Sequence, residues 1–164
     1  MPTLAALANI LENPGLGIPD YVVEKALRCA EAHKKAIAMF YRAGGKIALG
    51  TDAGTPFNRH GENAQELRHM VANGIAPIDA LRFGTSSAAE LLRLADRGRI
   101  VEGLAADLLI VRGDPSADIL MAADKANHIA VVKNGTRIDT AAGAGAQPDV
   151  TRHRGPQMPA ASLF

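Results

Sequence analysis

One aspartate, Asp52, lies in a setting that could support chemistry. It belongs to the segment Gly50-Thr51-Asp52-Ala53-Gly54, directly after the apolar run Ile47-Ala48-Leu49. The run predicts a short buried strand over 46–50, and the two glycines leave room for a ligand or an ion to approach the carboxylate. Barrels of alternating strands and helices place their catalytic groups at the carboxyl ends of the strands. Asp52 is therefore a candidate acid–base group or metal ligand, expected to project toward the mouth of such a barrel.

Two cationic side chains, Arg59 and His60, follow Asp52 in the same loop. We expect them near a substrate, because a cation in this position could pair with a peptide carboxylate. The alternative interpretation is an exposed loop with a histidine close to the next helix. Glu66 stands three residues after Asn63, the spacing of a capping box, and is interpreted as a capping residue.

Helical periodicity surrounds the predicted strand on both sides. Residues 20–43 repeat apolar side chains at spacings of three and four, with Leu27 among them, which predicts an amphipathic helix. Further helices are predicted over 63–73, from Pro77, and from Ser87, where Glu90 repeats the capping-box spacing. Helix, strand, loop and helix in this order are typical of a parallel α/β protein.

The pattern changes after Asp96. Short apolar strands are predicted over 99–101, 108–111 and 129–133, and Asn134-Gly135 leads from the last of these into Thr136-Arg137-Ile138. Asn-Gly between two strand-like runs predicts a tight hairpin, because both turn positions require positive φ. From about 141 to 164 the composition is rich in Ala, Gly and Pro without periodicity, which predicts a disordered tail.

Composition narrows the class of protein. A chain of 164 residues with 48% hydrophobic and 21% charged residues is typical of one globular domain. The net charge of +1 and the absence of a basic cluster argue against nucleic-acid or membrane binding. The single cysteine cannot form an internal disulfide. No apolar run is long enough to span a membrane and no signal pattern is present, so we expect a cytoplasmic protein.

A series of short motifs follows the chain in a fixed order. The series comprises Gly50-Thr51-Asp52-Ala53-Gly54, Arg59-His60-Gly61-Glu62-Asn63, Glu66-Leu67, Gly74-Ile75-Ala76-Pro77, Thr85-Ser86-Ser87-Ala88-Ala89-Glu90-Leu91, Arg97-Gly98-Arg99-Ile100, Glu102-Gly103-Leu104-Ala105-Ala106-Asp107-Leu108, Gly113-Asp114-Pro115 and Val131-Val132-Lys133-Asn134-Gly135. In this order the motifs resemble the C-terminal portion of the amidohydrolase superfamily, in its imidazolonepropionase-like and Xaa-Pro dipeptidase-like branch. The resemblance extends over about 2–139.

The resemblance implies a metal-dependent hydrolase on a distorted (β/α)₈ barrel beside a small β-sandwich. Such enzymes hold one or two divalent ions, usually zinc, and Asp52 matches the ligand that closes the eighth strand. The metal lowers the pKa of bound water toward 7, which makes hydroxide available near neutral pH. Asp52 would then be both a metal ligand and the group that passes a proton to the departing nitrogen. The implied substrate is a dipeptide or a cyclic amide, with Arg59 and His60 as substrate-binding residues.

The chain departs from the family pattern in its histidines. It has five, none of them in the His-x-His arrangement of the first barrel strand. A zinc site needs three or four protein ligands, so we expect a missing N-terminal barrel portion to supply the rest. The predicted organisation is α/β: the last two βα units of the barrel over 1–95, part of the composite β-sandwich over 96–139, and a disordered tail over 140–164. Apolar faces left open would favour homo-oligomers of the isolated chain.

A second interpretation comes from a different class of protein. The chain could be a non-catalytic remnant or partner-binding module that keeps Asp52 without a complete metal site. A folded protein without stoichiometric metal is expected in that case. The amidohydrolase interpretation instead expects metal once the N-terminal portion is supplied.

Overall fold

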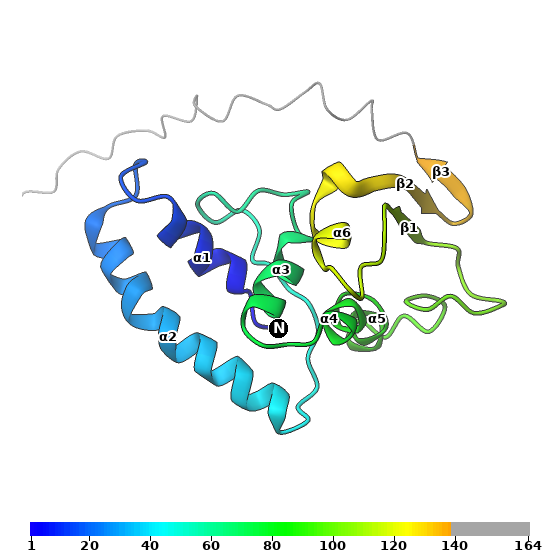
Figure 1. Ribbon diagram of the computed structural model, residues 1–164, viewed down its shortest axis with the longest axis horizontal. Coiled ribbons are helices and arrows are strands. Elements are labelled where there is room, and N and C mark those ends of the chain that lie inside the picture. The colour runs from blue at the N-terminus through cyan, green and yellow to red at the C-terminus, as the bar shows by residue number, and fades with distance from the viewer. Residues whose placement is uncertain (139–164) are drawn as a thin grey trace, which may run out of the picture.

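Residues 1–138 are described by a computed structural model (Figure 1). The helices are α1 (Leu4–Glu12), α2 (Asp20–Arg42), α3 (Gln65–Ala72), α4 (Pro77–Gly84), α5 (Ser86–Leu91) and α6 (Leu120–Ala123), with a 3₁₀ turn at Lys125–Asn127. The strands are β1 (Leu108–Val111), β2 (His128–Lys133) and β3 (Thr136–Ile138). The predicted tail over 140–164 lies outside the described residues.

The long helix α2 confirms the helix predicted over 20–43. Asp20 lies in its first turn and Arg42 in its last, where each charge interacts favourably with the helix dipole. Its inner face is lined by Ala26, Ala30 and Ile37, but Leu27, expected on the same stripe, is exposed. None of the helices in residues 1–138 is both long enough and apolar enough to cross a membrane.

The core lies where α3 and α4 meet α1, α2 and α6, in the middle of the view in Figure 1. Its members are apolar side chains that come from all of these elements: Leu4, Ile37, Ile47, Leu67, Met70, Ile75, Ala80, Ile119, Ala122 and Ala123. Met70 and Ala80 are completely inaccessible to solvent. The buried residues recur at helical spacing on α3, which explains why that segment folds as an amphipathic helix.

The three strands form one antiparallel sheet in the order β1-β2-β3. Leu108 pairs with Val132, and Lys133 pairs with Thr136 across the turn that joins β2 to β3. Both turn residues have positive φ, 48° at Asn134 and 76° at Gly135. The predicted hairpin and the predicted strands over 108–111 and 129–133 are therefore confirmed.

Two predicted strands are not present. Residues 46–50 do not pair as a strand with any other part of residues 1–138; the Leu49 amide instead donates to the carbonyl of Phe83 at 2.8 Å. Ile47 and Ala48 are nevertheless buried, so the apolar pattern reported burial correctly. A strand also requires a neighbour with free backbone groups. Residues 99–101 do not form a strand either, and Ile100 is 89% exposed.

Neither predicted capping box forms. Helix α3 begins at Gln65 and α5 at Ser86, and neither start has a side-chain cap. Glu90 pairs with Lys46 at 2.6 Å, and Glu66 reaches a different helix altogether. In both cases a contact distant in sequence replaces the local one.

Candidate functional site

The loop that carries Asp52 turns sharply at that residue. Asp52 has φ of 53°, a left-handed conformation that is uncommon for a residue with a side chain. Its carbonyl oxygen accepts hydrogen bonds from Asn58 Nδ2 at 3.1 Å and from Thr55 Oγ1 at 3.1 Å. The side chain of Asp52 is exposed in the chain as described. Its predicted roles as a metal ligand and catalytic group remain predictions.

Asn58 organises this loop from its inner side, and sequence reasoning missed it. Only 4% of the residue is exposed, and its Nδ2 donates to the carbonyl of Thr51 at 2.6 Å as well as to that of Asp52. The backbone carbonyl of Asn58 accepts a hydrogen bond from the backbone N–H of Gly54 at 2.8 Å. The available signal was an asparagine in a glycine-containing loop, because its amide can replace backbone partners in a turn.

The segment before Asp52 lies against the beginning of the chain. A Cβ atom added at Gly50 would lie 2.9 Å from the Cβ of Met1, closer than side chains can approach. Met1 and Gly50 are therefore in contact, and the absence of a side chain at Gly50 permits this close approach. Helix α4 covers the same segment, since a Cβ at Gly84 would lie 3.4 Å from Leu49 Cδ1.

His60 returns to the Asp52 loop, while Arg59 extends into solvent. A Cβ at Gly54, which has φ of 104°, would lie 3.3 Å from His60 Nε2, so the imidazole stands directly over this glycine. Both Arg59 and His60 are exposed. The structure thus brings His60 close to the loop of Asp52. The binding role of both cations stays a prediction.

Glu66 fastens α3 to the start of α1. Its carboxylate is fully buried and accepts the amides of Leu4 at 2.8 Å and Ala5 at 2.7 Å. Helix α1 has no cap of its own, because Thr3 at its start has φ of 50° and makes no capping hydrogen bond. Burial raises the pKa of Glu66 to about 7, although the two amides favour the ionised form. The capping role predicted for Glu66 is therefore observed, but on α1 and not on the helix that Glu66 belongs to.

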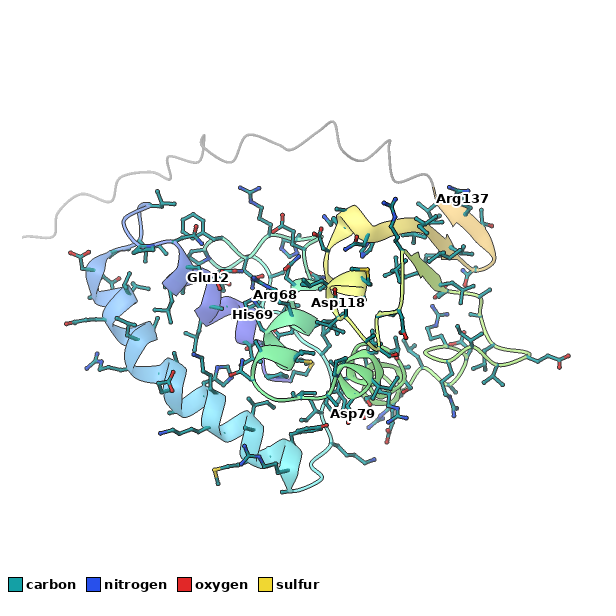
Figure 2. All side chains as sticks on the ribbon, viewed as in Figure 1. Glu12, Arg68, His69, Asp79, Asp118 and Arg137 are labelled. Carbon is teal, nitrogen blue, oxygen red and sulfur yellow. The ribbon has the colours of Figure 1, made fainter. Side chains whose placement is uncertain are left out.

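A second polar cluster lies where α1 meets α3, and Figure 2 shows Glu12, Arg68 and His69 close together there. Arg68 contacts Glu12 at 3.7 Å and His69 Nε2 at 3.5 Å. Burial lowers the pKa of His69, with the adjacent Arg68 acting in the same direction. His69 is only 7% exposed and packs inside this junction, where a lowered pKa disfavours its charged form.

The described residues do not by themselves fit a metal ion. Residues 1–138 contain no group of three or more His, Cys, Asp or Glu side chains placed to hold one. Asp52 and His60 approach the same loop, but two side chains do not reach the three or four ligands that a zinc site requires. Any metal at Asp52 would need ligands from outside this part of the chain.

An open groove of about 440 Å³ lies between α5 and the segment that follows it. It is lined by Ser86, Ser87, Glu90, Arg97 and Arg99, among others, and does not include Asp52 or His60. Arg97 is already engaged by Asp96 and Asp107. The groove is thus separate from the Asp52 loop.

The chain is similar to several solved structures of dipeptidases and related proteins. A Xaa-Pro dipeptidase with methionine bound in its active site is 34% identical, with a TM-score of 0.73. The match covers 85% of this chain and 34% of that one. A prolidase complexed with N-methylphosphonate-L-proline is 26% identical with the same TM-score, over 84% of this chain and 34% of that one. Ochratoxinase from A. niger is 28% identical with a TM-score of 0.68, over 82% of this chain and 31% of that one.

This chain spans about a third of the length of those structures. No curated protein matches the sequence. The model of the amidohydrolase family matches residues 4–138, which include the Asp52 loop, the helical core and the small sheet. This α/β chain therefore belongs to the amidohydrolase family.

Proposed function

We propose that this chain forms the C-terminal part of a metal-dependent amidohydrolase that hydrolyses a C–N bond in a dipeptide-like or cyclic-amide substrate. The observation that carries the proposal is the 34% identity to a Xaa-Pro dipeptidase over 85% of this chain. Since the match covers only 34% of that dipeptidase, the proposed activity needs further polypeptide. A barrel portion outside these residues would complete the site.

The proposed barrel would include the two neighbouring segments at the start of the chain and before Asp52. The start of the chain contacts the end of the segment before Asp52, with Met1 against Gly50, and in the proposed barrel the two would belong to adjacent strands. Residues 1–95 would then contribute the last two βα units and residues 96–139 part of a β-sandwich. A barrel supplies the neighbouring backbone groups that these segments lack here.

Asp52 is the carboxylate that this chain would contribute to the completed site. When bound, a divalent ion, most simply zinc, lowers the pKa of a bound water toward 7. Asp52 would be a ligand to one of one or two ions. As the base, it would take the proton that the water loses as it attacks the amide carbonyl, and would pass this proton to the nitrogen as the C–N bond breaks. Support comes from its position in an exposed loop that follows a buried apolar segment.

His60 and Arg59 would bind the substrate's carboxylate. His60 stands over Gly54, two residues from Asp52, and both Arg59 and His60 are exposed. A guanidinium and an imidazole can both donate to a carboxylate, and the guanidinium can do so through two parallel bonds. Their contribution would appear in KM more than in kcat.

The test is hydrolysis by this chain together with the polypeptide encoded directly upstream of it, either as one reading frame or as two co-produced chains. Xaa-Pro dipeptides, other dipeptides and cyclic amides form the substrate panel, with zinc content measured on the same samples. Asp52→Ala should abolish hydrolysis, at least 1000-fold, and reduce bound metal. Glu62→Ala, which removes another exposed carboxylate from the same loop, should leave both unchanged.

Two outcomes would overturn the proposal. One is an assembled protein that folds and hydrolyses none of the panel, which is what a partner-binding module predicts. The other is full activity in the Asp52→Ala protein, which would place the chemistry elsewhere. Size-exclusion chromatography of the chain alone would show whether its open apolar surfaces lead to homo-oligomers, and cell fractionation would test the expected cytoplasmic location.

A further inference from the structure

We infer that Asn58 is a positioning residue that sets the direction of the Asp52 carboxylate. The inference rests on the proposed function, because it concerns the geometry of the group proposed to do the chemistry. It adds a residue that neither the motif series nor the family match assigns. Its basis is the pattern of hydrogen bonds around one buried amide.

The Asn58 side chain holds the peptide planes on both sides of Asp52. Its Nδ2 donates at 2.6 Å to the carbonyl of Thr51, which belongs to the peptide that precedes the Asp52 Cα. The same nitrogen donates at 3.1 Å to the carbonyl of Asp52, which belongs to the peptide that follows it. Fixing both planes fixes φ and ψ of Asp52, since the backbone has only these two soft dihedrals at each residue.

The left-handed backbone conformation of Asp52 is less favourable than the ordinary ones, so without these hydrogen bonds the backbone would tend to relax. A φ of 53° brings the Cβ close to the following carbonyl, which disfavours this conformation for residues with a side chain, although aspartate tolerates it better than most. Because the Cα–Cβ bond direction follows from φ and ψ, a relaxed backbone would point the carboxylate elsewhere. A group that must meet ions or substrate within a fraction of an ångström depends on such a restraint.

Burial of the Asn58 amide makes the restraint strong. Only 4% of the residue is exposed, so water cannot readily replace its acceptors. Two backbone hydrogen bonds also close the loop. The backbone N–H of Asn58 donates to the carbonyl of Thr55 at 3.0 Å, and the backbone N–H of Gly54 donates to the backbone carbonyl of Asn58 at 2.8 Å. Thr55 Oγ1 donates to the carbonyl of Asp52 at 3.1 Å and accepts from Asn58 Nδ2 at 3.2 Å. Of the two side chains, Asn58 is the one that bonds to the peptide planes on both sides of Asp52.

The first arm of the test is hydrogen exchange of the full chain, in the assembled form. Asn58→Asp keeps the size of the side chain but removes the Nδ2 donor, and Asn58→Ala removes the side chain. Both should speed exchange over 50–60 at least tenfold. The matched control is Asn73→Ala, which removes an asparagine amide that donates to the His69 carbonyl at 2.7 Å. It should speed exchange only near the end of α3.

The second arm is kinetic. Both Asn58 variants should lower kcat at least tenfold while KM changes less than threefold, and Asn73→Ala should change neither. Wild-type exchange over 50–60 in the Asn58→Asp protein overturns the inference, as does wild-type kcat. If the wild-type assembly hydrolyses nothing, the proposed function fails, and the exchange arm still decides whether Asn58 holds the backbone of Asp52.

Discussion

The helical region and the small sheet differ in how far their apolar side chains are exposed to solvent. In the helical region Met70 and Ala80 are completely buried and Ile75 is 2% exposed. On the sheet side β1 carries Leu109 and Ile110 with 44% and 46% exposed. The helices enclose a core among themselves, whereas the sheet leaves apolar side chains of β1 exposed and buries only Ala130 of β2 among its strands. Backbone pairing and side-chain burial are thus separable in one small chain.

The difference follows from how each region is assembled. The β2–β3 hairpin can form from local interactions, because its turn residues are adjacent in sequence, although β1 joins β2 only across α6 and the 3₁₀ turn. The helical region instead depends on contacts between distant elements, with Glu66 holding the start of α1 across 62 positions. Three pairs of substitutions can sharpen this contrast.

The largest effect is expected at Met70. Met70→Ala should destabilise the protein by about 2–5 kcal/mol, because it leaves a cavity in the closed helical core. Ile138→Ala in β3 removes an apolar side chain of similar size that is 44% exposed and should cost well under about 1 kcal/mol. Urea unfolding followed by circular dichroism measures both. Equal losses would show that the two regions are not packed differently.

An intermediate effect is expected at Glu66, and it depends on pH. Because burial raises the pKa of Glu66 from 4.5 to about 7, the folded protein binds more protons than the unfolded one between these values. The stability that this group contributes is therefore greatest below pH 4.5 and falls as pH rises to 7, by an amount on the order of 2–3 kcal/mol. Glu66→Gln should flatten the stability profile over this interval.

The control for Glu66 is Glu90→Gln, which alters an exposed carboxylate whose pKa is lowered by Lys46. It should leave the pH profile between 4.5 and 7 unchanged. Thermal melts at half-unit pH steps provide the measurement. A Glu66→Gln protein with the same slope as wild type would mean that Glu66 is not responsible for the pH dependence.

The smallest effect is expected in the sheet, at its turn. Gly135→Ala places a side chain at φ of 76° and should cost about 1–2 kcal/mol. Asn134→Gly relaxes a neighbouring position at φ of 48° and should be close to neutral. Melting temperature and exchange over β2 and β3 report the result. A large loss of protection in α3 as well would show that the two regions unfold together.

Sequence reasoning succeeded where the determining contacts were local. The helix over 20–43 and the hairpin at Asn134-Gly135 were predicted within a residue or two, because periodicity and turn chemistry act over a few positions. It failed where a partner lay far along the chain. Ile47 and Ala48 are buried, but residues 46–50 form no strand with the other described residues, and Glu66 caps α1 instead of its own helix.

The candidate site follows the same rule. Asp52 stood out because its motif is short and its glycines are adjacent. Asn58 did not, because nothing in a linear pattern shows that its amide reaches back to two carbonyls at once. The proximity of His60 to Gly54 likewise depends on the path of the loop.

The clamp made by Glu66 has a consequence for synthesis. The amides of Leu4 and Ala5 leave the ribosome 62 and 61 residues before the carboxylate that receives them. At about 5–20 residues per second, that interval is roughly 3–12 s. During that time the first amides of nascent α1 lack the carboxylate that accepts them in the folded protein. A chaperone that binds the emerging chain would therefore act on this helix.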